Sequence, residues 1–216
     1  MILLIRHLES TKNINKSFSS HNDNEEITQN GFEKGIELSD SIHQFMKKNG
    51  LRTSCVYCAN SQRAILTAKL IANELNIGIK PFDELRSNKA GALEGKSEME
   101  ALNLNPLFMH QLKLFRTGIF SSYNFVKMDA REDKHHFENR VNKCVDSILC
   151  KRNDTLTIIV LHHSSITAAV IRFARELYSY PKDFYGHIDC ELGHLFLIDS
   201  NNIILCNESP IKLLDI

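Results

Sequence analysis

The chain has 216 residues, of which 43% are apolar, and its 26 basic and 26 acidic side chains cancel to a formal charge of zero. That length and apolar content suit one sizeable α/β domain and exclude wholesale disorder, and the balanced charge gives no general attraction to nucleic acid or to an anionic membrane. Arg6 and His7 interrupt the apolar run at the N-terminus. We therefore expect neither a secretory signal nor a membrane span, and a cytoplasmic location.

The N-terminal part of the chain predicts a buried strand, a loop and a helix. Residues 1–5, MILLI, form the short, continuous and branched run that is typical of a buried strand. Residues 12–26 are polar and rich in Asn and Ser, which predicts a loop. Thr28 then offers an N-cap to a helix that ends near residues 49–50. The buried face of that helix is predicted from apolar side chains at helical spacing, Phe32, Ile36, Ile42 and Met46, with the small Gly35 and Ser39 on the same stripe.

The middle of the chain predicts a second strand at residues 54–59 and a well-covered helix at residues 62–76. Residues 81–96 look irregular. Residues 97–133 combine a weak helical pattern with a stretch that has no clear period, which predicts a lid or insert.

The last third of the chain continues the alternation of helices and strands. A helix is expected around residues 137–148, the clearest strand is TLTIIVL at 155–161, a helix follows it, and residues 195–206 predict a hairpin. Strands that alternate with helices predict one α/β domain over residues 1–216, with a mainly parallel sheet covered by helices on both faces.

The six cysteines predict reduced thiols. Cys55 and Cys58 form a C-x-x-C pair, but no second pair stands at zinc-binding spacing. The pair lies inside an apolar, strand-like run, whereas a thioredoxin-type pair would open a helix. We therefore expect no metal site at these thiols.

Three strand ends bring arginine and histidine to one rim of the predicted sheet. Arg6 and His7 follow the first strand, His162 and His163 follow TLTIIVL, and Arg63 opens the helix after the second strand. Taken singly, each residue is more often an ordinary surface or core residue, but ligands of parallel sheets bind at the carboxyl ends of the strands. Guanidinium groups match phosphoryl oxygens, and a neutral imidazole can attack phosphorus. The rim therefore predicts a phosphate site. The sequence contains neither a glycine-rich P-loop nor an acidic cluster that would hold magnesium.

These residues resemble the histidine phosphatase, or phosphoglycerate mutase-like, superfamily. The resemblance runs from residue 1 to about residue 207 and rests on five elements in order. They are RHLES at 6–10 with Asn13, ITQNGFEKG at 27–35, RAILTA at 63–68, GALEG at 91–95 and HSS at 163–165.

The resemblance implies a three-layer α/β sandwich and a phosphatase that forms a phosphohistidine. His7 would be the nucleophile, Arg6, Arg63 and His163 would bind the phosphoryl oxygens, and Asn13 would assist. Water would then release phosphate without a metal or other cofactor. The implied substrate is a small phosphorylated compound or a phosphoprotein.

Two further side chains are expected to contact the substrate, Ser10 and His162. We choose His163 as the second site histidine because Ser164 and Ser165 follow it as glycines follow the family histidine. His162 is then expected to pack beside the pocket or to stand in as a proton donor.

The chain departs from the family pattern at three positions. Leu8 and Ser164 replace glycines, and Ser87 replaces the glutamate that serves the family as general acid. Losing such an acid costs about 10²–10⁴-fold in rate, chiefly with poor leaving groups. The stand-ins suggested by position are Asp83, Glu84, Glu94 and His162.

Two hypotheses follow from the missing acid. The first is a metal-independent phosphohydrolase for compounds with a good leaving group, favoured by the intact arginines and histidines. The second is a catalytically weakened relative that binds a phosphorylated ligand or a protein partner, favoured by Ser87.

Overall fold

The computed structural model describes residues 1–18, 25–117, 130–150, 155–179 and 188–206. Its sheet has six strands in the order β3-β2-β4-β1-β5-β6. The strands are β1 (Ile2–Arg6), β2 (Cys55–Ala59), β3 (Gly78–Phe82), β4 (Thr157–Leu161), β5 (Leu195–Ile198) and β6 (Ile203–Cys206). The first four are parallel, and β5 and β6 form an antiparallel edge. This mixed, mostly parallel sheet confirms the predicted α/β class.

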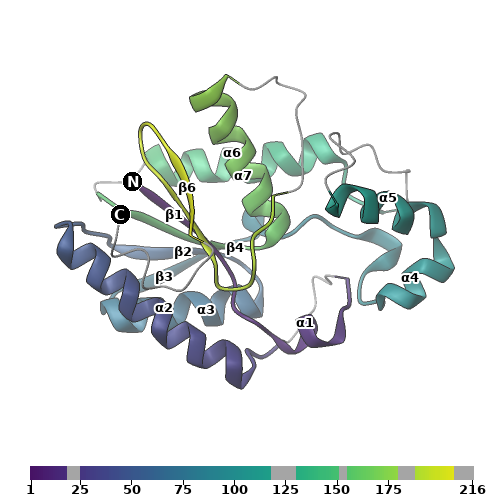
Figure 1. Ribbon diagram of the computed structural model, residues 1–216, viewed down its shortest axis with the longest axis horizontal. Coiled ribbons are helices and arrows are strands. Elements are labelled where there is room, and N and C mark those ends of the chain that lie inside the picture. The colour runs from purple at the N-terminus through teal and green to yellow at the C-terminus, as the bar shows by residue number, and fades with distance from the viewer. Residues whose placement is uncertain (19–24, 118–129, 151–154, 180–187, 207–216) are drawn as a thin grey trace.

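Helices cover both faces of the sheet. They are α1 (Thr11–Asn15), α2 (Gln29–Lys48), α3 (Gln62–Leu75), α4 (Glu98–Leu104), α5 (Pro106–Arg116), α6 (Lys134–Cys150) and α7 (His163–Tyr178). Figure 1 shows α2 and α3 on one face and α6 and α7 on the other, which gives the three layers. The short α1 and the pair α4–α5 lie beyond the end of the sheet where the parallel strands finish.

The two central strands, β1 and β4, bring the residues that follow them close together at one end of the sheet. Their side chains between Leu3 and Ile5 and between Ile158 and Leu161 are fully buried. The parallel register pairs Arg6 with Leu161, and the N–H of the next residue, His7, donates to the Leu161 carbonyl at 3.0 Å. Residues that follow these two strands therefore leave the sheet side by side.

The buried face of α2 agrees with the predicted one at Gly35, Ser39 and Ile42 and differs from it at two positions. Phe32 and Ile36 are exposed, at 44% and 53% of their surface. A Cβ at Gly35 would lie only 2.6 Å from a Leu8 methyl carbon, so this glycine allows the helix to pack closely against the segment after β1. The face that packs inward consists of Gly31, Gly35, Leu38, Ser39, Ser41, Ile42 and Phe45.

Two segments that the sequence left irregular contain regular structure. The predicted loop at residues 12–26 contains most of α1, and the irregular segment at residues 81–96 begins with the end of β3. Thr28 caps α2 as predicted, since its hydroxyl accepts from the Gly31 N–H at 3.0 Å. Within the expected lid, α4 and α5 are described and residues 118–129 lie outside the described chain. The single domain and the lid remain predictions.

The thiols of Cys55, Cys58, Cys144, Cys150 and Cys190 are free, as expected, and the side chain of Cys206 lies outside the described part. Both cysteines of the C-x-x-C pair lie in β2. In the segments that the structure describes, no helix combines the length and the apolar character needed to cross a bilayer.

Candidate active site

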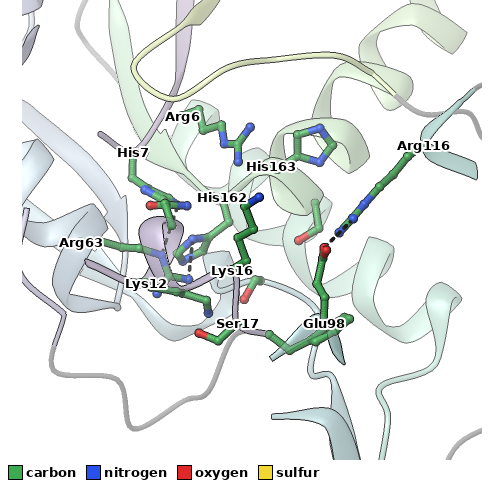
Figure 2. Close-up of a pocket in the computed structure, with 14 residues that line it drawn as sticks. Arg6, His7, Lys12, Lys16, Ser17, Arg63, Glu98, Arg116, His162 and His163 are labelled. Atoms are coloured by element: carbon green, nitrogen blue, oxygen red, sulfur yellow. Dashed lines mark hydrogen bonds and ion pairs between the residues drawn. The ribbon is translucent and has the colours of Figure 1, made fainter. Parts of the chain in front are cut away.

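A pocket of about 330 Å³ opens where β1 and β4 end (Figure 2). It brings together side chains from the three strand ends that the sequence placed at one rim. The predicted site residues that line it are Arg6, His7, Asn13, Arg63, His162 and His163. The roles expected of these residues stay predictions, but their convergence in one cavity is a feature of the fold.

His7 is buried, and its two ring nitrogens have different partners. Nδ1 lies 2.8 Å from the Leu8 carbonyl oxygen, and Nε2 lies 3.1 Å from Nε of Arg63. A carbonyl can only accept and a guanidinium can only donate, so Nδ1 carries the proton and Nε2 keeps its lone pair. Burial, followed by the nearby charge of Arg63, lowers the pKa of His7 well below its ordinary value. His7 is therefore a neutral imidazole with a defined tautomer, which is the form that attacks phosphorus.

His162 occupies the place beside His7. The two rings meet edge to face, with centroids 5.1 Å apart. Nδ1 of His162 lies 3.2 Å from Nη2 of Arg63 and must accept, so Nε2 carries the proton and donates to the Ser61 hydroxyl at 2.9 Å. Burial, followed by the Arg63 charge, also lowers the pKa of His162 well below its ordinary value. An imidazole that stays neutral has no proton of suitable acidity for a leaving group, which argues against His162 as the stand-in acid.

His163 also lines the pocket, and the choice of His163 as the histidine opposite His7 stays a prediction. His163 is the first residue of α7, and its Nε2 lies 2.8 Å from the Ile188 carbonyl oxygen. The small residues after it serve another purpose, because the Ser165 hydroxyl donates to two carbonyls of the neighbouring Leu85–Arg86 segment. The β1–β4 register would have identified His162 from sequence, since it makes the first residues after the two strands neighbours.

Arg6 is a mostly buried guanidinium with an unsatisfied donor. Its Nη1 donates to the Cys190 carbonyl. Its Nε is buried and has no hydrogen-bond partner among the described residues. Burial is the main cause that lowers the pKa of Arg6 from its ordinary value. A buried N–H without a partner is costly, and an anion in the pocket would satisfy it.

Glu25 is the main residue that the sequence reasoning missed. Its Oε2 lies 2.8 Å from Nη1 of Arg63, and its Oε1 lies 3.9 Å from Nζ of Lys12, with all three side chains largely buried. The carboxylate thus balances part of the positive charge behind the pocket. Nothing in the polar run at residues 12–26 distinguishes Glu25 from the exposed Glu26, so only the fold reveals it.

Asn13 and Ser10 have different places. Oδ1 of Asn13 accepts from both the N–H and the hydroxyl of Ser10, at 3.0 and 2.8 Å, so its amide nitrogen is the donor left for the pocket. Ser10 is fully buried and does not line the pocket. The structure therefore does not bring Ser10 to the pocket wall, and its hydroxyl holds Asn13.

The family glycine that Leu8 replaces is not needed here. Leu8 is absent from the described residues with positive φ, so its backbone does not require glycine. Its side chain is buried away from the pocket, and the space for it comes from the nearby Gly35 and Gly193. Ser164 likewise lies in the first turn of a helix, where any residue fits.

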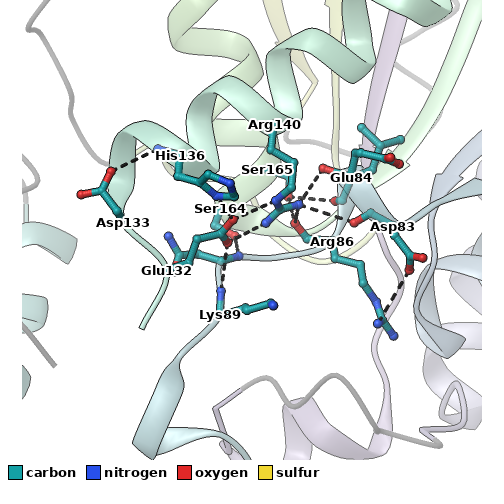
Figure 3. Close-up of polar contacts among 12 residues, drawn as sticks. Asp83, Glu84, Arg86, Lys89, Glu132, Asp133, His136, Arg140, Ser164 and Ser165 are labelled. Atoms are coloured by element: carbon teal, nitrogen blue, oxygen red, sulfur yellow. Dashed lines mark hydrogen bonds and ion pairs between the residues drawn. The ribbon is translucent and has the colours of Figure 1, made fainter. Parts of the chain in front are cut away.

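Ser87 lines the pocket on a loop that is held by two side chains (Figure 3). Arg140 donates to the carbonyls of Glu84 and Arg86 at 2.6 and 3.2 Å, while a two-point ion pair with Glu132, at 2.8 and 2.6 Å, fixes its guanidinium. The Ser165 hydroxyl also holds this loop, through the Leu85 and Arg86 carbonyls. The position of Ser87 relative to the pocket is therefore well defined.

Three of the four stand-in acids do not line this pocket. Asp83, Glu84 and Glu94 are absent from its wall, while Glu98 is the carboxylate that lines it among the described residues. Glu98 pairs with Nη1 of Arg116 at 2.9 Å. The other cations that the sequence missed at this wall are Lys12 and Lys16, one helical turn apart after the Arg-His motif. No group of three or more metal-ligating side chains is arranged for a metal ion in the described chain.

The comparisons with known proteins agree with this geometry. A family model described as the histidine phosphatase superfamily (branch 1) matches residues 2–197. The fold is similar to Bacillus stearothermophilus YhfR, with a TM-score of 0.72 at 18% identity, covering 96% of this chain and 95% of that one. It is also similar to the alpha-ribazole phosphatase from Shigella flexneri, with a TM-score of 0.69 at 17% identity, covering 96% of this chain and 95% of that one. A third similar structure is phosphoserine phosphatase from Entamoeba histolytica, solved with 3-phosphoglyceric acid, with a TM-score of 0.65 at 20% identity, covering 94% of this chain and 93% of that one. At these identities the likeness shows the fold.

Proposed function

Because the chain belongs to the histidine phosphatase superfamily, we propose that it is a metal-independent phosphohydrolase that forms a phosphohistidine on His7. The observation that carries the proposal is a neutral His7 whose Nε2 lone pair faces the buried guanidinium of Arg63, in a pocket that Arg6 also lines. Arg6 has a buried N–H that lacks a partner among the described residues. A bound phosphoryl group supplies the acceptor that this donor needs.

In the first step, the phosphoryl group enters between Arg6 and Arg63. The Arg63 hydrogen bond to Nε2 of His7 then transfers to a phosphoryl oxygen, which frees the lone pair for in-line attack. The bond between Nε2 and phosphorus forms while the bond to the leaving oxygen breaks, and its electrons leave with that oxygen. The Leu8 carbonyl holds the Nδ1 proton and stabilises the positive charge that develops on the ring.

In the second step, water attacks phosphorus from the side that the leaving group vacated. The P–N bond breaks, its electrons return to Nε2, and the proton of the water leaves with the phosphate product. His162 keeps Arg63 in place through the 3.2 Å contact and is the second imidazole of the site. We thus propose His162 for the role that was expected of His163.

Ser87 decides which substrates suit this site. A serine hydroxyl cannot protonate a departing alkoxide, so good substrates are aryl phosphates, anhydrides or phosphohistidine, as small compounds or phosphoproteins. The alternative hypothesis, a weakened relative that binds phosphorylated ligands without turnover, is favoured by the same residue.

A phosphatase screen with EDTA present tests the proposal. The substrates are 4-nitrophenyl phosphate, acetyl phosphate, a sugar phosphate and a phosphohistidine peptide, and we expect turnover of all except the sugar phosphate. His7→Ala should abolish turnover and the acid-labile, base-stable phosphoprotein, whereas His43→Ala, an exposed histidine paired with Glu74, should leave both unchanged. His162→Ala should impair phosphate binding more than His163→Ala does. Turnover that survives in His7→Ala contradicts the mechanism, and phosphate binding without any turnover favours the alternative.

A further inference from the structure

A second cavity lies between α4 and α5, next to the active-site pocket. It has a volume of about 560 Å³, which is within the usual range for small-molecule sites. Its apolar lining comes from both helices, namely Met99, Leu102, Pro106, Met109 and Leu112. Met109 and Leu112 pack on the small core of Leu93, Ala101 and Phe108, so this groove has a firm floor.

The groove adjoins the active-site pocket. Glu98 and Arg116 line both cavities, and their ion pair of 2.9 Å forms the shared wall. The two charges offset each other, so this wall carries little net charge. Figure 2 shows this pair across the pocket from His7 and Arg63.

The direction of the substrate follows from this arrangement. A phosphoryl group held at His7 has the sheet behind it, and the Glu98–Arg116 pair lies across the pocket from it, so the rest of the substrate can extend towards that pair. The groove beyond that pair leaves apolar side chains exposed, with 68% of Met99 and 45% of Leu102 accessible. Apolar surface that adjoins a polar pocket is typical of a ligand groove.

We propose that the groove between α4 and α5 is the subsite for an apolar leaving group, so that the substrates are phosphate compounds with an extended apolar leaving group. This inference rests on the proposed phosphohydrolase function and adds the substrate class. This substrate class agrees with a serine at position 87, because an aryl oxide or a carboxylate leaves without the proton that Ser87 cannot supply.

Binding of n-alkylphosphonates, from methyl to octyl and below their micelle concentrations, tests the subsite by titration calorimetry. Each methylene that enters the groove should tighten binding, up to about fourfold when fully buried. The variant Met99→Ser/Leu102→Asp should bind methylphosphonate as the wild type does and lose the dependence on chain length. Leu104→Asp and Leu107→Asp are the matched controls, because both leucines are exposed on the same helices and neither lines the groove.

Turnover separates this inference from the proposed function. The ratio kcat/KM for 4-alkylphenyl phosphates should rise with chain length, since their leaving groups have similar pKa values and differ only in apolar size. Turnover or binding that does not depend on chain length overturns the subsite and leaves the phosphatase proposal standing. Binding that depends on chain length without turnover of any ester overturns the phosphatase proposal alone, and the absence of both binding and turnover overturns both.

Discussion

Replacing Glu25 with Gln removes the one described carboxylate that contacts Arg63 while keeping the size of the side chain. The pair is largely buried, with 3% of the Arg63 side chain and 11% of the Glu25 side chain exposed, and Lys12 is only 8% exposed. Breaking a buried ion pair by removing one partner costs about 3–5 kcal/mol. The Gln amide oxygen can still accept from Arg63, so we expect the lower end, about 3 kcal/mol of unfolding free energy.

Phosphate should reverse part of this loss. The variant carries one more uncompensated positive charge beside the pocket, so phosphate should bind more tightly than to the wild type. A ligand that binds only the folded state at 100 times its Kd adds about 2.7 kcal/mol to stability. We therefore expect Glu25→Gln to be strongly stabilised by phosphate, and more so than the wild type.

Urea unfolding followed by circular dichroism measures both effects, with and without phosphate at matched ionic strength. Glu26→Gln is the control, since Glu26 is an exposed neighbour and should change stability by less than about 0.5 kcal/mol. If Glu25→Gln unfolds like that control in phosphate-free buffer, the ion pair does not balance the pocket charge and the reasoning is refuted.

Three further predictions concern the acid, the histidines and the packing of α2. Ser87→Glu should raise kcat/KM for alkyl phosphates by up to about 10²–10⁴-fold and leave aryl phosphates little changed, whereas the equally large but non-acidic Ser87→Gln should not. The folded pKa values of His7 and His162 lie well below the unfolded value of about 6.5, so below that pH the unfolded chain binds more protons. Stability should then fall as pH falls, by up to about 1.4 kcal/mol per pH unit for each histidine, and less steeply in His162→Gln. Gly31→Ala should cost about 1–3 kcal/mol in urea unfolding, because its Cβ would lie 2.4 Å from a backbone carbonyl oxygen after β1, whereas Gly78→Ala meets no atom within 4 Å and should not destabilise.

The strands other than β3 were predictable, because apolar runs such as residues 2–5 and 156–161 are buried on both faces of the sheet and leave a plain signal. The buried face of α2 was predictable only in part. Phe32 and Ile36 were expected to be buried with Gly35, yet the helix packs through Gly31 and Gly35, since contact with the segment after β1 needs small residues. The spacing of apolar residues in a sequence does not show where two backbones approach each other closely.

The site was predictable where a residue type and a strand end coincide, as at Arg6, His7 and Arg63. The choice of His163 relied on the small residues that follow it, and one of these, Ser165, binds the loop at Leu85. The pairing register of β1 and β4, two strands far apart in the sequence, shows which histidine lies beside His7. Glu98 and Arg116 come from helices that meet the pocket only through tertiary packing, so no local pattern could place them there.

Arg63 connects stability to function in this fold. In the structure its guanidinium contacts Glu25 and both buried imidazoles, so its charge is balanced and its donors are used without a ligand. In the proposed mechanism, attack by His7 requires Arg63 to exchange its Nε contact for a phosphoryl oxygen, while the contact with Glu25 can remain. We therefore propose that Glu25 lets a cationic pocket fold while empty and keeps Arg63 in position during the exchange. A pocket without that carboxylate would bind phosphate more tightly, but it would also release the phosphate product more slowly.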